Sequence, residues 1–175
     1  MATEELALSI LTRTNPREDD FERIMQSHER MVVSTAYRLL GRLDDARDAA
    51  QEVFLRLFRN LDRIQGDPKP WLYRVTVNVC NDHLRRRVPV IPADTHRPDP
   101  SPDATHAIHL IDRKRLLMQA LATLPARERA AIVLRDIEGL STREVASVLG
   151  VEEVTIRSQI SVARVKLAKY VRNRQ

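Results

Sequence analysis

Residues 140–169 constrain the fold most, because they combine two helical patterns, one glycine between them and a cationic second half. Ser141 and Glu144 lie three residues apart and form a capping box that can begin a helix. Gly150 supplies a turn, and a second apolar stripe at helical spacing begins at Ile156. That stripe consists of Ile156, Ile160, Ala163, Leu167 and Tyr170. The pattern predicts a helix-turn-helix.

From Thr155 to the C-terminus this segment carries positive charge only. The charged residues are Arg157, Arg164, Lys166, Lys169, Arg172 and Arg174. A helix of one charge sign beside a tight turn fits the major groove of a nucleic-acid duplex. The same pattern also permits a solvated helix in an ordinary helical bundle.

Composition restricts both the fold class and the partners. The chain has 175 residues, enough apolar side chains for a core and only four glycines, which favours an all-α fold. Acids cluster before Glu52, whereas bases gather at Arg85-Arg86-Arg87 and in the last helix, so we expect one surface for a polyanion and another for a basic protein. The sequence shows no apolar run of membrane-spanning length and no signal peptide, so we expect a cytoplasmic protein without membrane insertion.

The single cysteine, Cys80, argues against a disulfide scaffold and a thiolate metal cluster. It lies on the apolar side of a helical pattern, which favours a buried structural thiol. Cys80 and His83 could supply two metal ligands, but two further ligands are hard to find nearby. We therefore expect no metal and no cofactor. The sequence also shows no nucleophile–base arrangement and no glycine-rich phosphate loop, so we expect no enzymatic activity.

The chain divides into two helical parts separated by a segment rich in proline. Helical periodicity predicts helices at 20–40, 44–61, 71–87, 113–122 and 125–137, ahead of the helix-turn-helix. The prolines between residues 88 and 103 predict an extended linker. We predict a lead at 1–15, a first domain at 16–87, a linker at 88–110 and a second domain at 111–175. The expected fold is therefore all-α, with two small helical domains joined by an extended proline-rich linker.

Three motifs follow one another along the chain. Residues 45–54 read DARDAAQEVF; residues 71–74 read WLYR and precede Asn78, Asp82 and Arg85-Arg86; Leu124-Pro125 precedes the segment from Ser141 to Arg164. In this order, with a linker between the second and the third, they resemble bacterial sigma factors of the sigma-70 superfamily. The resemblance is to the compact extracytoplasmic-function (ECF) group, which keeps only the second and fourth conserved regions.

The resemblance implies that the first motif docks on core RNA polymerase, at a basic coiled coil of the β′ clamp, and that the second domain meets the β flap. The implied docking residues are Asp45, Asp48, Gln51, Glu52 and Phe54. Asp44, Asp48 and Glu52 recur at i, i+4 and i+8, on one side of a helix and beside its apolar side. A solvated acidic face is the alternative interpretation.

The resemblance assigns recognition and melting of the promoter −10 element to the second motif. The implied residues are Trp71, Arg74, Asn78, Asp82, Arg85 and Arg86. Aromatic side chains beside arginine suit unpaired bases and their phosphates, and the Asn78 amide can pair with a base edge. We expect the Trp71 ring to anchor the core. By resemblance, residues 65–70 and the start of the next helix form the pocket for a flipped base.

The third motif resembles the region that reads the −35 element. The implied residues are Arg143, Glu144, Thr155, Arg157, Ser158, Ser161, Val162, Arg164 and Lys166. Arg157 can bond a guanine in two places and Ser158 a base or phosphate, whereas Arg164 and Lys166 suit phosphates. Gln159 and Val162 stand where the family often has arginine, and Glu152 and Val154 where it often has proline and glycine. Base preference therefore cannot be transferred.

The sequence predicts a sigma factor that binds core RNA polymerase and directs sequence-specific promoter recognition and transcription initiation. Its expected partners are the polymerase, promoter DNA in double- and single-stranded form, and an anti-sigma factor; a role in stress response fits the group. The alternative is a stand-alone helix-turn-helix regulator, which would need neither the acidic docking segment nor the Trp71–Asn78 group.

Overall fold

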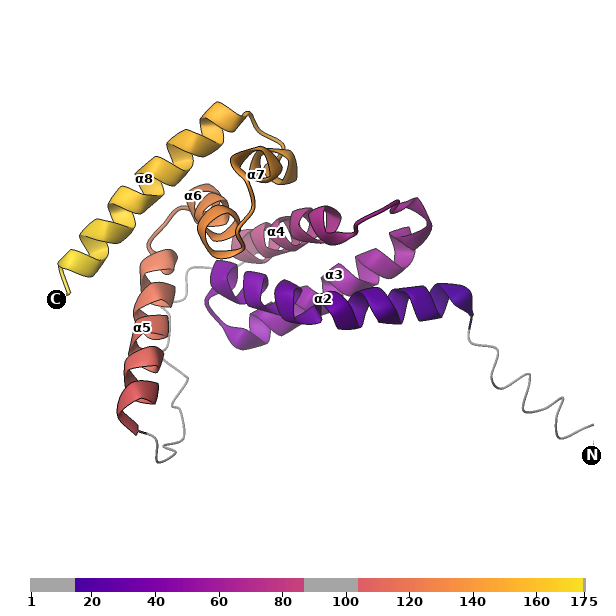
Figure 1. Ribbon diagram of the computed structural model, residues 1–175, viewed down its shortest axis with the longest axis horizontal. Helices are drawn as coiled ribbons and strands as arrows, with labels where there is room; N and C mark the ends of the chain where they lie inside the picture. Colours follow the sequence, from indigo (N-terminus) through magenta and orange to yellow (C-terminus); the bar gives the residue numbers. More distant parts are fainter. Residues whose placement is uncertain (1–14, 87–103, 175) are drawn as a thin grey trace, which may run out of the picture.

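The computed structural model describes residues 15–86 and 104–174, with no side chain described from 104 to 111. Within these ranges the regular structure is entirely helical (Figure 1). The all-α prediction is therefore confirmed. The predicted lead, except Asn15, and the part of the predicted linker at 88–103 lie outside the described residues.

The first domain is a three-helix bundle of α2 (Pro16–Leu40), α3 (Leu43–Asn60) and α4 (Lys69–Arg86), with a 3₁₀ turn, η1 (Leu61–Arg63), after α3. Helix α2 begins four residues before the predicted start, because the Asn15 side chain accepts a hydrogen bond from the Arg17 amide and proline suits the first turn. It ends at Gly41, whose φ of +80° is left-handed. The three helices bury a core of aliphatic side chains that includes Val32, Leu57 and Leu72.

The second domain contains α5 (Ala104–Ala122), α6 (Ala126–Ile132), a π-helical turn η2 (Val133–Ile137), α7 (Thr142–Leu149) and α8 (Glu153–Arg172). Helix α5 begins inside the predicted linker at 88–110, nine residues before the predicted start of that helix. The last proline of the linker is Pro102, so no proline opposes a helix from Ala104 onward.

The helix-turn-helix forms where the local signals place it. The Ser141 hydroxyl accepts a hydrogen bond from the Glu144 amide at 3.2 Å, and the Glu144 carboxylate accepts one from the Ser141 amide at 2.7 Å. This confirms the capping box. Gly150 makes the turn with a φ of +67°. Helix α8 starts at Glu153, so it is not purely cationic: Glu153 pairs with Arg157 at 3.0 Å.

The two domains pack against each other. The end of α2 lies beside α5, α6 and η2, and α4 lies beside α7 (Figure 1). Their buried apolar side chains form one continuous cluster. None of the described helices combines the length and the apolar character that a membrane span needs.

Candidate protein and nucleic-acid interfaces

A groove runs between α2 and α3 on the first domain, next to the predicted docking residues. Its volume is about 720 Å³, and Gln51 and Phe54 are among its lining residues. Gln51 and Asp48 are exposed on α3, whereas Phe54 is almost covered. Of the five predicted docking residues, Gln51 and Phe54 therefore line one groove. Asp48 lies on the same helix, one turn before Glu52.

Apolar residues that the prediction left out complete this groove. Leu55 and Phe58 are 57% and 38% exposed, and both line it together with Phe21 and Met25 from α2. The Phe21 and Phe58 rings meet edge to face at 5.3 Å. Phe58 stands at an apolar position of the helical pattern of α3, but its ring remains partly exposed. The sequence could have indicated this groove through Leu55, because it is an apolar residue on the polar side of the α3 pattern.

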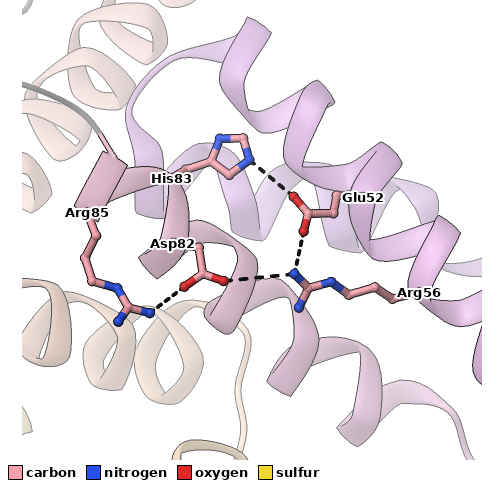
Figure 2. A network of polar contacts seen from close by, with 5 residues as sticks. All are labelled: Glu52, Arg56, Asp82, His83 and Arg85. Atoms are coloured by element: carbon pink, nitrogen blue, oxygen red, sulfur yellow. Dashed lines mark hydrogen bonds and ion pairs between the residues drawn. The ribbon is translucent and has the colours of Figure 1, made fainter.

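A polar network connects α3, which carries the predicted docking residues, with α4 (Figure 2). Arg56 bonds the Glu52 carboxylate on its own helix and lies 3.9 Å from Asp82 on α4. The His83 ring nitrogen lies 3.7 Å from Glu52, and Arg85 bonds Asp82. Glu52 and Asp82, which the resemblance assigns to different partners, are thus joined through one guanidinium.

The predicted −10 residues form a stripe along α4. Arg74, Asn78 and Asp82 recur at i, i+4 and i+8, and Arg85 and Arg86 are exposed at the end of the helix. Asn78 is exposed, so its amide is accessible to a base. In contrast, Trp71 is half-buried and packs against the core, as expected for an anchor.

Cys80 lies on the opposite, buried side of α4 with 1% of its surface exposed. Burial raises the pKa of its thiol to about 12, which keeps the thiol neutral at physiological pH. The predicted burial of this thiol is therefore confirmed. The described part of the chain holds no group of three or more His, Cys, Asp and Glu residues placed to bind a metal ion.

On the second domain, α8 presents a polar surface near its N-terminal end. Its exposed predicted residues are Thr155, Arg157, Ser158, Ser161 and Val162. Arg143 is exposed on α7. Glu144 is exposed on α7 and also has a structural task, because the hydrogen bonds from Ser141 that hold the pKa of its carboxyl below the ordinary value cap this helix.

Two predicted phosphate-binding cations already have partners inside their own domain. Arg164 bonds both carboxylate oxygens of Asp136 in η2, at 2.9 and 2.7 Å, and thereby holds the pKa of that carboxyl below its ordinary value. The Lys166 ammonium bonds Glu128 of α6 at 2.8 and 2.9 Å. Both cations are therefore paired in the structure, with acidic partners that stand 28 and 38 residues earlier in the chain.

Comparisons with known proteins agree with this arrangement. Residues 24–89 match the family Sigma-70 region 2, and residues 114–167 match the family Sigma-70, region 4. The ECF RNA polymerase sigma factor SigE of Mycolicibacterium smegmatis is 38% identical over 159 residues, which cover 86% of this chain and 61% of that relative. The ECF sigma factor SigM of Mycobacterium tuberculosis is 34% identical over 152 residues, which cover 85% of this chain and 76% of the relative.

A solved structure shows the same fold. The sigma factor RpoE of Bartonella quintana, in complex with the anti-sigma factor NepR, aligns with a TM-score of 0.67 over 87% of this chain and 97% of that chain, at 22% identity. Both halves of the chain match a sigma-70 region, and SigM is matched over three quarters of its length. The chain therefore belongs to the ECF group of the sigma-70 family of RNA polymerase sigma factors.

Proposed function

We propose that this chain binds core RNA polymerase, positions it at promoters and helps to open the duplex. The observation that carries the proposal is the first domain, which combines an apolar groove for a protein with an exposed Arg74–Asn78 stripe for nucleic acid. A stand-alone regulator would need only the helix-turn-helix. Transcription initiation, by contrast, needs a protein contact, a duplex contact and a single-strand contact.

The groove between α2 and α3 is the proposed docking surface for polymerase. Phe54, Leu55 and Phe58 offer apolar contact, Gln51 adds a polar amide, and Asp48 supplies negative charge beside the groove. An apolar groove with an acidic border fits an amphipathic basic helix, such as the β′ coiled coil that the resemblance implies. The Glu52 carboxylate also pairs with Arg56 and lies near His83, so these two residues compete with polymerase for its charge.

Helix α4 is the proposed −10 reader. The exposed amide of Asn78 can pair with the edge of a separated base, and Arg74, Arg85 and Arg86 can meet phosphates. Helix α8 is the proposed −35 reader, with Arg157 and Ser158 at the end that a helix-turn-helix points toward base edges. Neither task requires a chemical step, so we assign the chain no enzymatic activity.

We further propose that the chain works in the cytoplasm, where core polymerase is, and that an anti-sigma factor inhibits it. The RpoE structure with the same fold supports the second point, because it contains an anti-sigma factor. Purification from native cells under resting conditions should therefore recover an inhibitory protein. Recovery of the free chain alone from both resting and stressed cells would contradict this proposal.

The test of the function adds the purified chain to core polymerase and a library of promoters. Promoter-specific transcripts that depend on this chain are expected, and their start sites would reveal both recognition elements. Tight binding to duplex sites with no stimulation of transcription would instead favour the stand-alone regulator.

Reversal of one charge tests the docking surface separately. Asp48→Lys should weaken binding to core polymerase by about tenfold or more, because it places a cation against a basic surface. Glu22→Lys is the matched control, since Glu22 is also an exposed acid on a first-domain helix but is absent from the groove lining. Equal affinities for Asp48→Lys and the wild type, measured by fluorescence titration, would remove Asp48 from the interface.

A further inference from the structure

A single carboxylate of the second domain is held by three side chains of the first. Glu138 accepts hydrogen bonds from the hydroxyl of Thr35 at 3.0 Å, from the guanidinium of Arg38 at 2.6 Å and from the phenol of Tyr73 at 3.1 Å. Thr35 and Arg38 lie on α2 and Tyr73 on α4. The Glu138 side chain is only 11% exposed. Its charge is therefore satisfied by residues 65 to 103 positions away.

The backbone before Glu138 is shaped to deliver this side chain. Helix α6 widens into the π-helical turn η2, and the Glu138 amide donates to the carbonyl of Val133 at 2.9 Å. Gly139 then adopts a φ of +79°, and the Leu140 amide donates back to Leu134 at 3.0 Å. The helix thus ends sharply at Glu138, with its side chain aimed at the first domain. π-Helical turns are rare and occur frequently at functional sites.

Two further polar contacts cross between the domains near this carboxylate. The Arg129 guanidinium of α6 donates to the carbonyl of Leu39 at 2.6 Å, in the last turn of α2, where a cation is favourable. Arg74 of α4 donates to the carbonyl of Ser147 in α7 at 2.8 Å. Arg74 belongs to the proposed −10 stripe. While Nη2 bonds Ser147, fewer donors of the same guanidinium are left for promoter phosphate, and the second domain lies beside it.

The chemistry of these contacts suits a junction that opens. A charge pair withdrawn from water loses hydration that offsets much of its attraction, so it specifies geometry more than it adds stability. When the domains separate, Glu138, Arg38, Thr35 and Tyr73 all regain water. Burial raises the pKa of the Tyr73 hydroxyl, so the hydroxyl stays protonated and donates its hydrogen bond to Glu138 in the closed form. Polar contacts between domains are typical of reversible interfaces.

We propose that Glu138 is an intramolecular latch, which holds the second domain over the Arg74 end of α4 and keeps the free sigma factor closed. Release of the latch exposes that end of the −10 stripe and lets the two domains engage separate surfaces. Only molecules in the open form then bind core polymerase or promoter DNA. Because the latch keeps most molecules closed, it lowers the apparent affinity of the free chain.

Energy transfer between two dyes on the full-length chain tests the latch directly. Gln26→Cys on α2 and Ala168→Cys on α8 place labels at exposed positions in different domains, and buried Cys80 should resist labelling, which the parent chain can verify. Arg38→Glu and Glu138→Arg should each move most molecules from high to low transfer. The double variant Arg38→Glu/Glu138→Arg should return most of them to high transfer, because the hydroxyls of Thr35 and Tyr73 can also accept hydrogen bonds.

The design separates latch opening from a loss of folding and from a change in net charge. The two single variants alter net charge in opposite directions, so a shared effect cannot come from charge alone. Circular dichroism checks that each variant is folded. If either reversal unfolds the chain, the single variants Arg38→Gln and Glu138→Gln take its place without a double variant, and each should also lower transfer. Single variants at wild-type transfer, or a double variant as open as the singles, would overturn the proposal.

A second readout links the latch to function and rests on the proposed polymerase binding. Both single variants should bind core polymerase several-fold more tightly than the wild type, and the double variant should return toward it. Glu22→Gln serves as a control for the loss of one exposed acid. Opening without tighter binding would show that the latch does not gate docking, whereas the transfer measurement does not depend on polymerase at all.

Discussion

Helices α4 and α8 both carry cations that the family resemblance assigns to DNA, but the two domains hold those cations differently. In α4, Arg85 bonds Asp82 on the same helix, and Arg56 continues the network to Glu52 on α3 (Figure 2). In α8, Arg164 and Lys166 bond acids of η2 and α6, within the scaffold behind the recognition helix.

This difference separates two roles for charge. The ion pairs of α8 connect the helix to its own domain, and Arg157 and Ser158 stay exposed for the proposed contact with bases. The network of the first domain instead joins the surface proposed for polymerase to the surface proposed for DNA. A contact at one of these surfaces can therefore alter the position of charged groups at the other.

The largest expected effect comes from removal of the apolar anchor of α8. Ile156 is fully buried, so Ile156→Ala should lower the free energy of unfolding by about 2–5 kcal/mol and abolish binding to −35 duplexes at moderate temperature. Val165→Ala on the same helix is the control, because Val165 is 68% exposed and its truncation should change stability by less than about 0.5 kcal/mol. Similar urea midpoints for the two variants would contradict the role of Ile156 as anchor.

Loss of a base contact in the second domain should have the next largest effect. Arg157→Ala should cost about 1–3 kcal/mol at the preferred −35 sequence and relax specificity there. Arg157 bonds Glu153 of its own helix and is exposed, so it can exchange this partner for a guanine. Titration of matched and scrambled duplexes decides the point. An equal loss on both would make Arg157 a phosphate contact.

Asn78→Ala should act on the first domain alone. It removes one hydrogen bond to a separated base, so we expect a loss of about 0.5–1.5 kcal/mol in open-complex formation. Binding to polymerase and to −35 duplexes should remain near the wild-type level, because Asn78 is absent from the groove and from α8. Permanganate footprinting of unpaired thymines reports the opening. A normal footprint in the variant would exclude Asn78 from the −10 surface.

Lys166→Ala should have the smallest effect and separates scaffold charge from DNA charge. Lys166 bonds Glu128 and is half-exposed, so its loss should lower the free energy of unfolding by only about 0.2–1 kcal/mol. The salt dependence of −35 binding should change little. If the slope of log affinity against log salt instead falls by about one, Lys166 leaves Glu128 to bind phosphate, as the sequence alone had suggested.

Local signals explain which features the sequence could predict. Ser141, Glu144 and Gly150 act on residues within a few positions, so the bounds of α7 and the turn followed from the sequence almost to the residue. The burial of Ile156 and Cys80 followed from helical spacing. By contrast, α5 begins earlier than expected, at Ala104. The proline-rich composition predicts a linker but does not show how soon after the last proline, Pro102, a helix can begin.

Long-range partners explain what the sequence could not show. Whether Arg164 is paired depends on Asp136, which lies in the π-helical turn η2, 28 residues earlier in the chain. The exposure of Phe58 depends on how far α2 covers α3. The Glu138 contacts depend on two domains that the linear pattern treats as separate. None of these contacts leaves a periodic mark in the sequence.

The central claim is that one chain reads two promoter elements while bound to polymerase, with α4 on one element and α8 on the other. The most direct test inserts five base pairs between the two elements of a responsive promoter. Five base pairs are about half of the 10–10.5 base pairs in a helical turn, so the insertion turns the two elements to nearly opposite faces of the duplex. Transcription with core polymerase should be lost, while changes to spacer sequence at constant length should be tolerated. Unchanged transcription from the promoter with the five-base-pair insertion would contradict it.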